Sequence, residues 1–376
     1  MVWNEGGNIN IYTLIIFVII SFFSYLHSEE TYKVDIDSKG VKTFYNKKPA
    51  DPDFKIGLKK IGEISAGQLD SLDAAKFMVY DFDFDKDGNS IILDHNRMWK
   101  FSREGKFIKN WSRQGYGPGE IVNPFNFCLV NDTIYLSNSV PPKIMKFDTE
   151  GNFIEDINPY YRTYYPRDIF FGCNDFFLGA VIVYKDNEEI NTEYIVRYDN
   201  KSFDAEKVIF KREYKKTGKD WFAGVNDFIY AGDEKVFFVV DNSFNDYKIN
   251  CFDSRNGKLK YKIRKNHIRA KSDKKEEIHY GFYNGEKIAM KTGTNQFEEA
   301  INMMYYDKYD RLWVNSNHRK NGEDKSALYF DIFKDGIFLN RVKLNTEYNY
   351  IYAFKLEGDK IVEYGGNNNV YFYEFK

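Results

Sequence analysis

Cysteine and proline are scarce in this sequence, with 3 and 8 residues among 376. Cys128, Cys173 and Cys251 are far apart and odd in number, so they form neither a metal-type CxxC pair nor a disulfide framework. Cys128 and Cys173 occupy matching places in two neighbouring repeats. A bridge between them is therefore an alternative, but buried free thiols are the favoured state.

An excess of charge of one sign is also missing, because 54 Lys and Arg residues are interleaved with 56 Asp and Glu residues. A nucleic-acid-binding protein would normally carry a concentrated basic face, so this function class is excluded. The G-x-S-x-G elbow, the HExxH helix and the Rossmann fingerprint are absent as well. These absences disfavour the enzyme classes that depend on such motifs, although an enzyme whose site is assembled from scattered loops would also lack them.

One long uncharged hydrophobic run is present, from Ile11 to Leu26. It is shorter than the about 20 residues of a membrane-spanning helix and close to the upper limit of a signal-peptide core. Ser28 suits a cleavage site, but the segment before the run carries Glu5 and no Lys or Arg. A signal peptide over residues 1–28 is favoured, with a retained membrane anchor and a buried soluble helix as alternatives. We therefore expect an exported protein, periplasmic or at the cell surface, that meets the membrane only through this segment.

The remaining chain is rich in aromatic residues, with 30 Tyr and 34 Phe, which favours β-strands. It also repeats itself: residues 81–111 and 126–157 share one order of four strands separated by short turns. Gly105 and Gly151 occupy equivalent tight turns, where a positive φ is expected. Weaker copies, with turn residues Asn200, Gly257 and Gly336, cover residues 168–210, 227–263, 303–344 and 351–376.

The last copy lacks a fourth strand, and residues 54–61 (FKIGLKKI) form an unpaired strand candidate ahead of the first copy. Supplying this strand to the last copy removes two exposed sheet edges at once. The prediction is an all-β, six-bladed β-propeller with four-stranded antiparallel blades over residues 53–376, closed by an N-terminal strand and preceded by a hydrophobic leader helix. Seven blades are the competing number, because residues 264–297 are long enough to contain a degenerate repeat.

The first half of the chain contains recognisable motifs: KKIGEI at 59–64, DKDGN at 85–89, ILDHNRMWKFSREGKFI at 92–108 and SRQGYGPGEIVNP at 112–124. Together they resemble bacterial exported six-bladed β-propeller proteins related to NHL repeats. Residues 32–50 also resemble the short hairpin that these proteins carry ahead of the propeller, which assigns residues 29–52 to an N-terminal extension. The resemblance implies the fold and export, and it implies little about activity because the scaffold hosts many functions.

A propeller places the loops between strands two and three on the same face as the connections between blades. Polar side chains in these loops are predicted to surround the mouth of the central channel, where two histidines could bind a divalent metal. No third ligand is identifiable, so no cofactor is predicted, and hydrated loop residues are the simpler interpretation. The candidate ligand-binding residues are Asp94, His95, Asn96, Arg113, Glu120, Asp241, Asn317 and His318, with Asn138, Asn242, Asn315 and residues 365–369 in the same loops.

Three other segments have competing interpretations. Residues 115–120 (GYGPGE) lack the GK[ST] ending of a phosphate loop, so a crossover between blades is favoured. Residues 85–89 begin like a calcium loop, but Ser90 and Asn96 stand where an EF-hand needs Gly and Glu, so a hairpin turn is favoured. Residues 264–297 begin with a charged half that could form a short helix, and a solvated excursion is favoured over a partner-binding insertion.

Two functions stay open. The favoured one is a non-enzymatic module that binds a protein, peptide or glycan at the cell envelope. The alternative is a metal-dependent hydrolase or lyase with its site at the mouth of the channel.

Overall fold

A computed structural model provides the fold. The structure describes residues 30–72, 77, 79–94, 97–111, 113–158, 166, 168–173, 175–183, 190–215, 229–240, 246–267, 278–283, 286–291, 300–316, 323, 327–347, 354–364 and 369–376.

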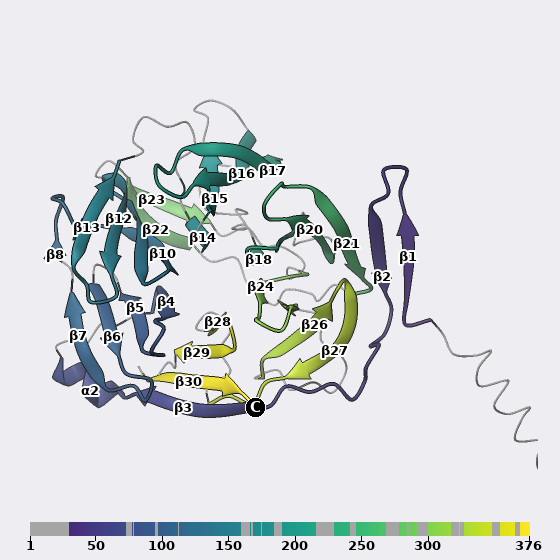
Figure 1. The fold of residues 1–376 in the computed structure, drawn as a ribbon, viewed down its shortest axis with the longest axis horizontal. Helices are drawn as coiled ribbons and strands as arrows, with labels where there is room; N and C mark the ends of the chain where they lie inside the picture. Colours follow the sequence, from purple (N-terminus) through teal and green to yellow (C-terminus); the bar gives the residue numbers. More distant parts are fainter. Residues whose placement is uncertain are drawn as a thin grey trace, which may run out of the picture.

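Six antiparallel, four-stranded blades surround a central channel, which confirms the predicted propeller (Figure 1). The first strand of each blade lies nearest the channel and the fourth lies at the rim. Blade 1 contains β4 (Asp81–Phe84), β5 (Ser90–Asp94), β6 (Arg97–Phe101) and β7 (Phe107–Trp111). Blade 2 contains β10 (Pro124–Val130), β11 (Thr133–Ser139), β12 (Pro142–Asp148) and β13 (Phe153–Ile157). Blade 3 contains β14 (Asp168–Gly172), β15 (Phe176–Val183), β16 (Ile190–Asp199) and β17 (Ala205–Lys215).

The second half of the ring repeats this arrangement with one insertion. Blade 4 contains β18 (Tyr230–Gly232), β19 (Val236–Val240), β20 (Lys248–Asp253) and β21 (Leu259–Lys265). Blade 5 contains β24 (Met303–Tyr306), β25 (Arg311–Asn315), β26 (Tyr329–Lys334) and β27 (Ile337–Lys343). Along the chain these two blades are separated by a two-stranded hairpin, β22 (Ile278–Tyr283) and β23 (Glu286–Lys291), which is not a seventh blade and appears near β10 and β14 in Figure 1. The predicted insertion therefore begins later than residue 264, because residues 264 and 265 belong to β21; the predicted short helix falls on residues outside the described part.

An N-terminal strand completes the sixth blade, as predicted. Blade 6 contains β28 (Phe354–Glu357), β29 (Lys360–Tyr364) and β30 (Val370–Phe375), and β3 (Leu58–Ile64) pairs antiparallel with β30. The register pairs Leu58 with Phe375 and Ile64 with Val370. The strand thus begins four residues later than the predicted 54–61, because its length is set by the partner strand; Lys376 N–H donates to the Gly57 carbonyl at the end of the ladder.

Aspartate side chains cap many of the tight turns. The Asp85 carboxylate accepts hydrogen bonds from the backbone N–H groups of Asp87 and Asn89 at 3.0 and 2.8 Å. This confirms that residues 85–89 form a hairpin turn, since the carboxylate satisfies the turn's own backbone. Gly105 and Gly151 have positive φ, +90° and +73°, as predicted.

The turn at Asn200 differs from the other predicted turns. Gly257 and Gly336 have positive φ, whereas in blade 3 the positive φ belongs to Phe203, at 52°. Phe203 is fully buried and stacks on Phe177 with ring centroids 4.5 Å apart. Burial of the aromatic ring thus stabilises a backbone conformation that glycine adopts in the other blades.

The N-terminal segment extends one blade and contacts the next. β1 (Tyr32–Ile36) and β2 (Lys42–Asn46) form the predicted hairpin, and β2 also pairs parallel with β21, which makes a six-stranded sheet (Figure 1). Asn46 is buried and donates through Nδ2 to the Gly336 carbonyl at 3.0 Å, while its Oδ1 accepts from Phe338 N–H at 2.8 Å. Asn340 donates through Nδ2 to the Pro52 carbonyl at 2.8 Å. We call residues 32–64 the N-terminal strap, because they run along blades 4, 5 and 6.

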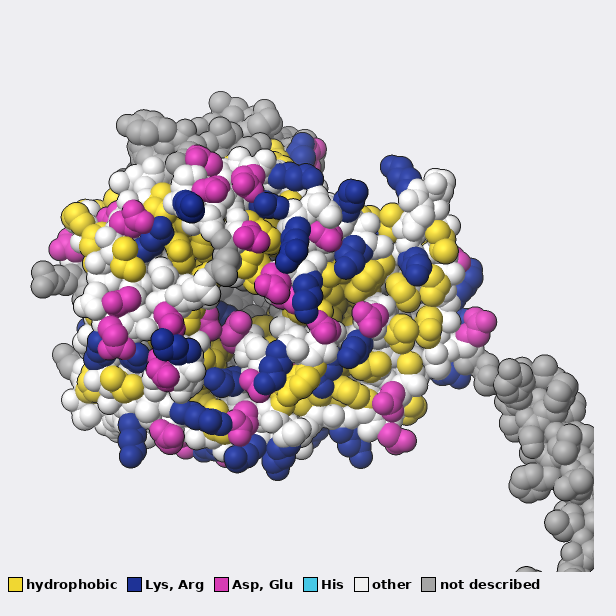
Figure 2. Space-filling model, viewed as in Figure 1, with side chains coloured by type: hydrophobic (Ala, Val, Ile, Leu, Met, Phe, Trp, Pro, Cys, Tyr) yellow, Lys and Arg dark blue, Asp and Glu magenta, His cyan; other side chains and the backbone are white. Residues whose placement is uncertain are grey.

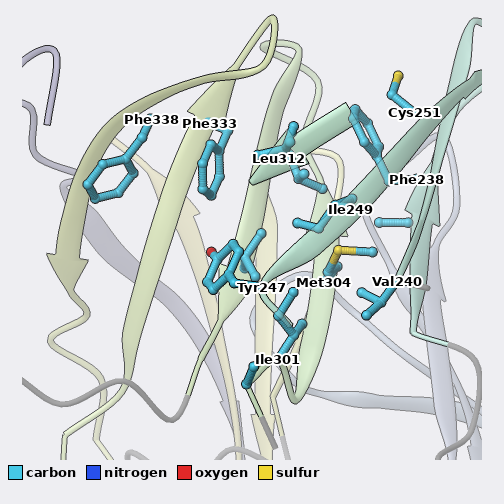
Figure 3. Packing of buried hydrophobic residues seen from close by; sticks show 14 of the residues in the cluster. Phe238, Val240, Tyr247, Ile249, Cys251, Ile301, Met304, Leu312, Phe333 and Phe338 are labelled. Atoms are coloured by element: carbon cyan, nitrogen blue, oxygen red, sulfur yellow. The ribbon is translucent and has the colours of Figure 1, made fainter. Parts of the chain in front are cut away.

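Apolar side chains fill the spaces between neighbouring blades. The cluster between blades 4 and 5 includes Phe238, Ile249, Met304 and Phe333, which point toward one another from the two sheets (Figure 3). A cavity of about 120 Å³ lies at the same junction, with Val236, Leu312 and Phe333 in its lining and Lys260, Asp310 and Asp335 also beside it. At each junction the facing sides of two neighbouring blades are buried against each other, and such apolar interfaces continue around the ring.

The cysteines and helices complete the description. None of the three cysteines forms a disulfide, as favoured; Cys251 is buried as expected, while Cys128 and Cys173 are only half-buried. The short helix α2 (Ala66–Ser71) was not predicted, and the hydroxyl of Ser65 caps it by accepting from Gln68 N–H at 3.2 Å. Among the described residues, no helix has the length and apolar character needed to cross a membrane.

Candidate functional site

The two faces of the ring are built differently. One face, the turn face, carries the short turns between strands one and two and between strands three and four, such as residues 85–89 and 335–336. The opposite face, the loop face, carries the loops between strands two and three and the connections between blades. These connections include residues 266–302, between β21 and β24, and residues 316–328 form the longest loop between strands two and three. Long loops on a rigid scaffold are the usual location of binding residues, so the loop face has the greater capacity for recognition.

Glu120 lies on the loop face, but its carboxylate turns into its own connection. Oε2 of Glu120 accepts from Gly117 N–H at 2.9 Å, and a side chain at Gly115 would collide with the same oxygen. The short strands β8 (Arg113–Gln114) and β9 (Glu120–Ile121) pair parallel and form the base of the loop. Lys143 closes it by donating to the Gly117 carbonyl at 2.6 Å. Residues 115–120 are therefore a crossover between blades 1 and 2, as predicted, and Glu120 stabilises it.

The other described candidates are also held by local contacts. Asp94 is the last residue of β5 and is 5% exposed. Asn138 is buried, and its Oδ1 accepts from Val122 N–H at 2.9 Å. Asn315 donates to the Tyr329 carbonyl at 2.9 Å, and Asn369 accepts from Ala66 N–H at 2.7 Å. In these contacts the three asparagines fix loop ends to neighbouring backbone.

Most of the predicted ring at the channel mouth is not placed. The Arg113 backbone belongs to β8, and its side chain lies outside the described part. The remaining candidates, His95, Asn96, Asp241, Asn317 and His318, also lie outside it, together with Asn242 and residues 365–368.

Metal-binding groups can be searched for only in the described part of the chain. There, no three His, Cys, Asp or Glu side chains converge closely enough to hold a metal ion. His267, which has a described side chain, packs against Tyr247 with ring centroids 6.2 Å apart. The two histidines proposed as ligands are not among the described residues, so this search does not reach them.

A buried ion network lies near the loop face between blades 4 and 5. Asp331, on β26, is fully buried and contacts Lys265 Nζ at 3.0 Å and Arg341 Nη1 at 3.2 Å. The Tyr247 hydroxyl donates to the same carboxylate at 2.9 Å. Burial acts to raise the pKa of Asp331, but Lys265 and Arg341 outweigh it and hold the pKa at about 2. The carboxylate is therefore ionised at neutral pH.

This network also anchors two of the long loops. Lys265 is the last residue before the connection between blades 4 and 5. Ser316 and Glu323 come from the loop that contains Asn317 and His318; the Ser316 hydroxyl donates to Asp331 at 3.1 Å, and Arg341 Nε donates to Glu323 at 2.9 Å. The connection between blades 4 and 5 thus begins next to the charged Lys265, and the other loop is held at Ser316 and at Glu323. Sequence reasoning did not identify these residues, because their partners come from different blades.

A second group of charges lines the channel where blade 6 meets blade 1. On β4, Asp81 and Asp83 alternate with two phenylalanines, and on β28, Lys355 and Glu357 alternate with Phe354 and Leu356. Lys355 forms an ion pair with Asp81 and approaches the Phe82 carbonyl at 3.4 Å. Figure 2 shows acidic and basic side chains around the hollow at the centre of the ring. The alternation DFDF and FKLE was the available signal in the sequence, because strand one of a blade turns alternate residues toward the channel.

The protein surroundings shift the pKa values of these groups. Burial and the neighbouring Glu357 raise the pKa of Asp83 well above its usual value, against the backbone N–H groups of Phe84 and Leu129. Desolvation by the surrounding channel wall also raises the pKa of Glu357, although its side chain is still exposed, and it lowers the pKa of the partly exposed Lys355 to about 8. The two carboxyl groups therefore keep a proton to higher pH than isolated carboxyl groups would. Such a group can hold a proton or attract a cationic group, and it marks the channel wall as a candidate site.

Comparisons with known proteins agree on the architecture. A family model described as a six-bladed beta-propeller, DUF5128, matches residues 83–213, which span most of blades 1 to 3. The chain has the six-bladed propeller fold. No curated protein sequence matches it.

Several solved structures are similar to the chain at low sequence identity. A putative exported protein from Bacteroides fragilis is 12% identical, with a TM-score of 0.50 over 89% of this chain and 99% of that one. A member of the DUF4221 family from Bacteroides vulgatus is 12% identical, with a TM-score of 0.47 over 86% and 98% of the two chains. Virginiamycin B lyase from Staphylococcus aureus is 11% identical, with a TM-score of 0.41 over 85% and 99%. At such identities the similarity concerns the fold alone.

Proposed function

We propose that this protein is an exported propeller of the NHL-related type that binds a protein, peptide or glycan of the cell envelope at its loop face, without catalysing a reaction. The observation that carries the proposal is the difference between the two faces. Tight, self-capped turns close the turn face, whereas the long connections and loops leave the ring on the loop face.

Three further observations support it. The blades are packed into a rigid ring that the N-terminal strap closes, so loops on one face keep a fixed spacing. The ion network around Asp331 anchors two of the loops to that ring. The uncharged run from Ile11 to Leu26 supports export, since it has the character of a signal-peptide core.

Site-specific photo-crosslinking tests the proposal with a matched pair of tyrosines. Tyr116 lies in the crossover on the loop face and is 68% exposed, while Tyr309 lies in a turn on the turn face and is 45% exposed. A photoreactive amino acid replaces one or the other in the full chain, which is then mixed with an extract of the native cell envelope. We expect a discrete crosslinked species from position 116 and none from position 309. The same species from both positions, or from 309 alone, would contradict binding at the loop face.

The alternative, a metal-dependent hydrolase or lyase, is tested separately. Elemental analysis of the purified full chain should find no stoichiometric divalent ion if the protein is a binding module. One tightly held ion per chain, lost when His318 is replaced by alanine, would favour the enzyme instead. Crosslinking and elemental analysis are independent, so one result does not decide the other.

A further inference from the structure

The outermost strand of the six-stranded sheet is an exposed edge. β1 pairs only with β2 in the part of the chain that the structure describes, and the hairpin projects outside the ring (Figure 1). Val34 and Ile36 on this strand are 36% and 64% exposed, although both are apolar. Exposed edge strands of this kind present unpaired N–H and C=O groups to another chain.

The ladder within the hairpin fixes which backbone groups face outward. Asp37 N–H donates to the Val41 carbonyl at 3.1 Å, and Lys47 N–H donates to the Thr31 carbonyl at 3.0 Å. In an antiparallel pair the hydrogen-bonded positions alternate, so odd-numbered residues of β1 bond toward β2. The N–H and C=O groups of Tyr32, Val34 and Ile36 therefore point to the free edge.

We propose that two copies of this chain associate through β1, antiparallel and about a twofold axis at Val34. In this register Val34 pairs with Val34 of the second copy, and Tyr32 pairs with Ile36 of the second copy. All three outward-facing residues then find partners, for about six N–H···O bonds between the chains. The contact is isologous, so it closes as a dimer and does not continue into a filament.

The charges on β1 select this register. Lys33 lies opposite Asp35 of the second copy, in a non-hydrogen-bonded pair where side chains approach most closely. If the register slips by two residues in one direction, Lys33 lies opposite Lys33 of the second copy. If it slips in the other direction, Asp35 lies opposite Asp35 of the second copy. Both alternatives therefore bring like charges together. The side chains of Lys33 and Asp35 are 59% and 47% exposed, so a second chain can reach both, although Lys33 Nζ and Asp35 Oδ1 lie 2.8 Å apart within one chain.

A lysine on an edge strand ordinarily prevents pairing, because it meets no opposite charge. Here Lys33 and Asp35 stand at equal distances on either side of Val34, so the twofold arrangement places each lysine opposite an aspartate. The opposite face of the strand is apolar, since Tyr32 and Val34 lie on the side of Phe44, and Tyr32 packs near Phe44 with ring centroids 6.3 Å apart. The edge is therefore complementary to itself in hydrogen bonding, charge and apolar contact.

Sedimentation equilibrium of the full chain at physiological salt tests the proposal. We expect a weak dimer whose mass-average value rises from 44.5 kDa with concentration. Val34→Pro removes an outward N–H that has no bond within the chain, and it should raise the dimer dissociation constant about tenfold while leaving the fold intact. Lys33→Asp should also raise it about tenfold or more, because two opposite-charge pairs become like-charge pairs.

The matched control exchanges both charges. Lys33→Asp combined with Asp35→Lys restores two opposite-charge pairs in the same register, so dimerisation should return to the native level. Circular dichroism of each variant separates a lost contact from a lost fold. A monomer at every concentration overturns the proposal. So does a dimer that is unaffected by Val34→Pro, or a double exchange that remains as weak as Lys33→Asp. A native chain that stays monomeric but captures another protein at β1 assigns the edge to that partner and equally overturns self-pairing.

Discussion

Replacement of Asn46 by alanine should weaken the attachment of the N-terminal strap to blade 5. Asn46 is 1% exposed, and its amide bonds two backbone groups of blade 5, the Gly336 carbonyl and the Phe338 N–H. A third bond, to the Arg264 carbonyl at 3.3 Å, is only partly buried, so water can replace it. Each buried group left without a partner costs about 1–3 kcal/mol. The expected loss in the free energy of unfolding is therefore about 2–6 kcal/mol for the two groups.

Asn340→Ala is the matched control, because Asn340 also joins the strap to blade 5. Its amide donates to the carbonyls of Pro52 and Phe54, which lie nearer to solvent and can be hydrated, so we expect a loss below about 1 kcal/mol. Urea unfolding followed by tryptophan fluorescence, to which the buried Trp99 and Trp313 contribute, measures both variants. Equal losses in the two variants, or less than about 1 kcal/mol for Asn46→Ala, would refute the argument that burial of the bonded groups sets the energy.

Three further predictions concern the ion network, the channel and a turn. The pKa of Asp331 is about 2 in the folded protein against a usual value of 3.8, so the ionised carboxylate should stabilise the fold by about 2 kcal/mol. This stabilisation should be present above pH ~4 and lost as the pH falls through 2. Asp331→Asn should abolish this part of the acid dependence of the unfolding free energy. Glu357→Gln should lower the pKa of Asp83, which carbon-13 NMR titration measures. It should also reduce the loss of stability that occurs as the pH rises through that pKa. An unchanged titration of Asp83 would show that the two carboxyl groups do not interact. Gly105→Ala should cost more than about 2 kcal/mol in thermal unfolding, since φ is +90° and the added carbon would lie 2.1 Å from a backbone oxygen of β3. Gly40→Ala, with positive φ and open space, should cost about 1 kcal/mol, and similar losses at both positions would contradict the role of the close approach.

The two faces of the ring imply different roles for the two charged groups. The Asp331 network lies near the loop face and fastens loops that are candidates for recognition. The carboxyl pair of Asp83 and Glu357 lies on inner strands that end in turns at the opposite face. A ligand that entered the channel from the loop face would therefore meet them only after it had passed the loops.

The number of blades, the strand order and the ring closure could be predicted because they depend on local patterns. Alternating apolar residues define each strand, and turn glycines such as Gly105 recur at equivalent places in the copies. The unpaired strand near the N-terminus and the three-stranded blade at the C-terminus are then expected to pair, since each would otherwise leave a sheet edge exposed. The closing strand was placed four residues too early because register depends on the partner strand, which local sequence does not contain.

The sequence by itself therefore determined the architecture, since each blade is specified by contacts close in the chain. Only the tertiary structure decided which charged side chains meet. Asp331 acquires Lys265 from another blade, and Lys355 reaches Asp81 from the opposite end of the chain. The parallel pairing of β2 with β21 likewise joins segments more than two hundred residues apart, as the register of Asn46 with Lys265 shows. The physical reason is that ring closure brings distant strands to one seam, and the energy of a buried charge depends on neighbours that no local pattern specifies.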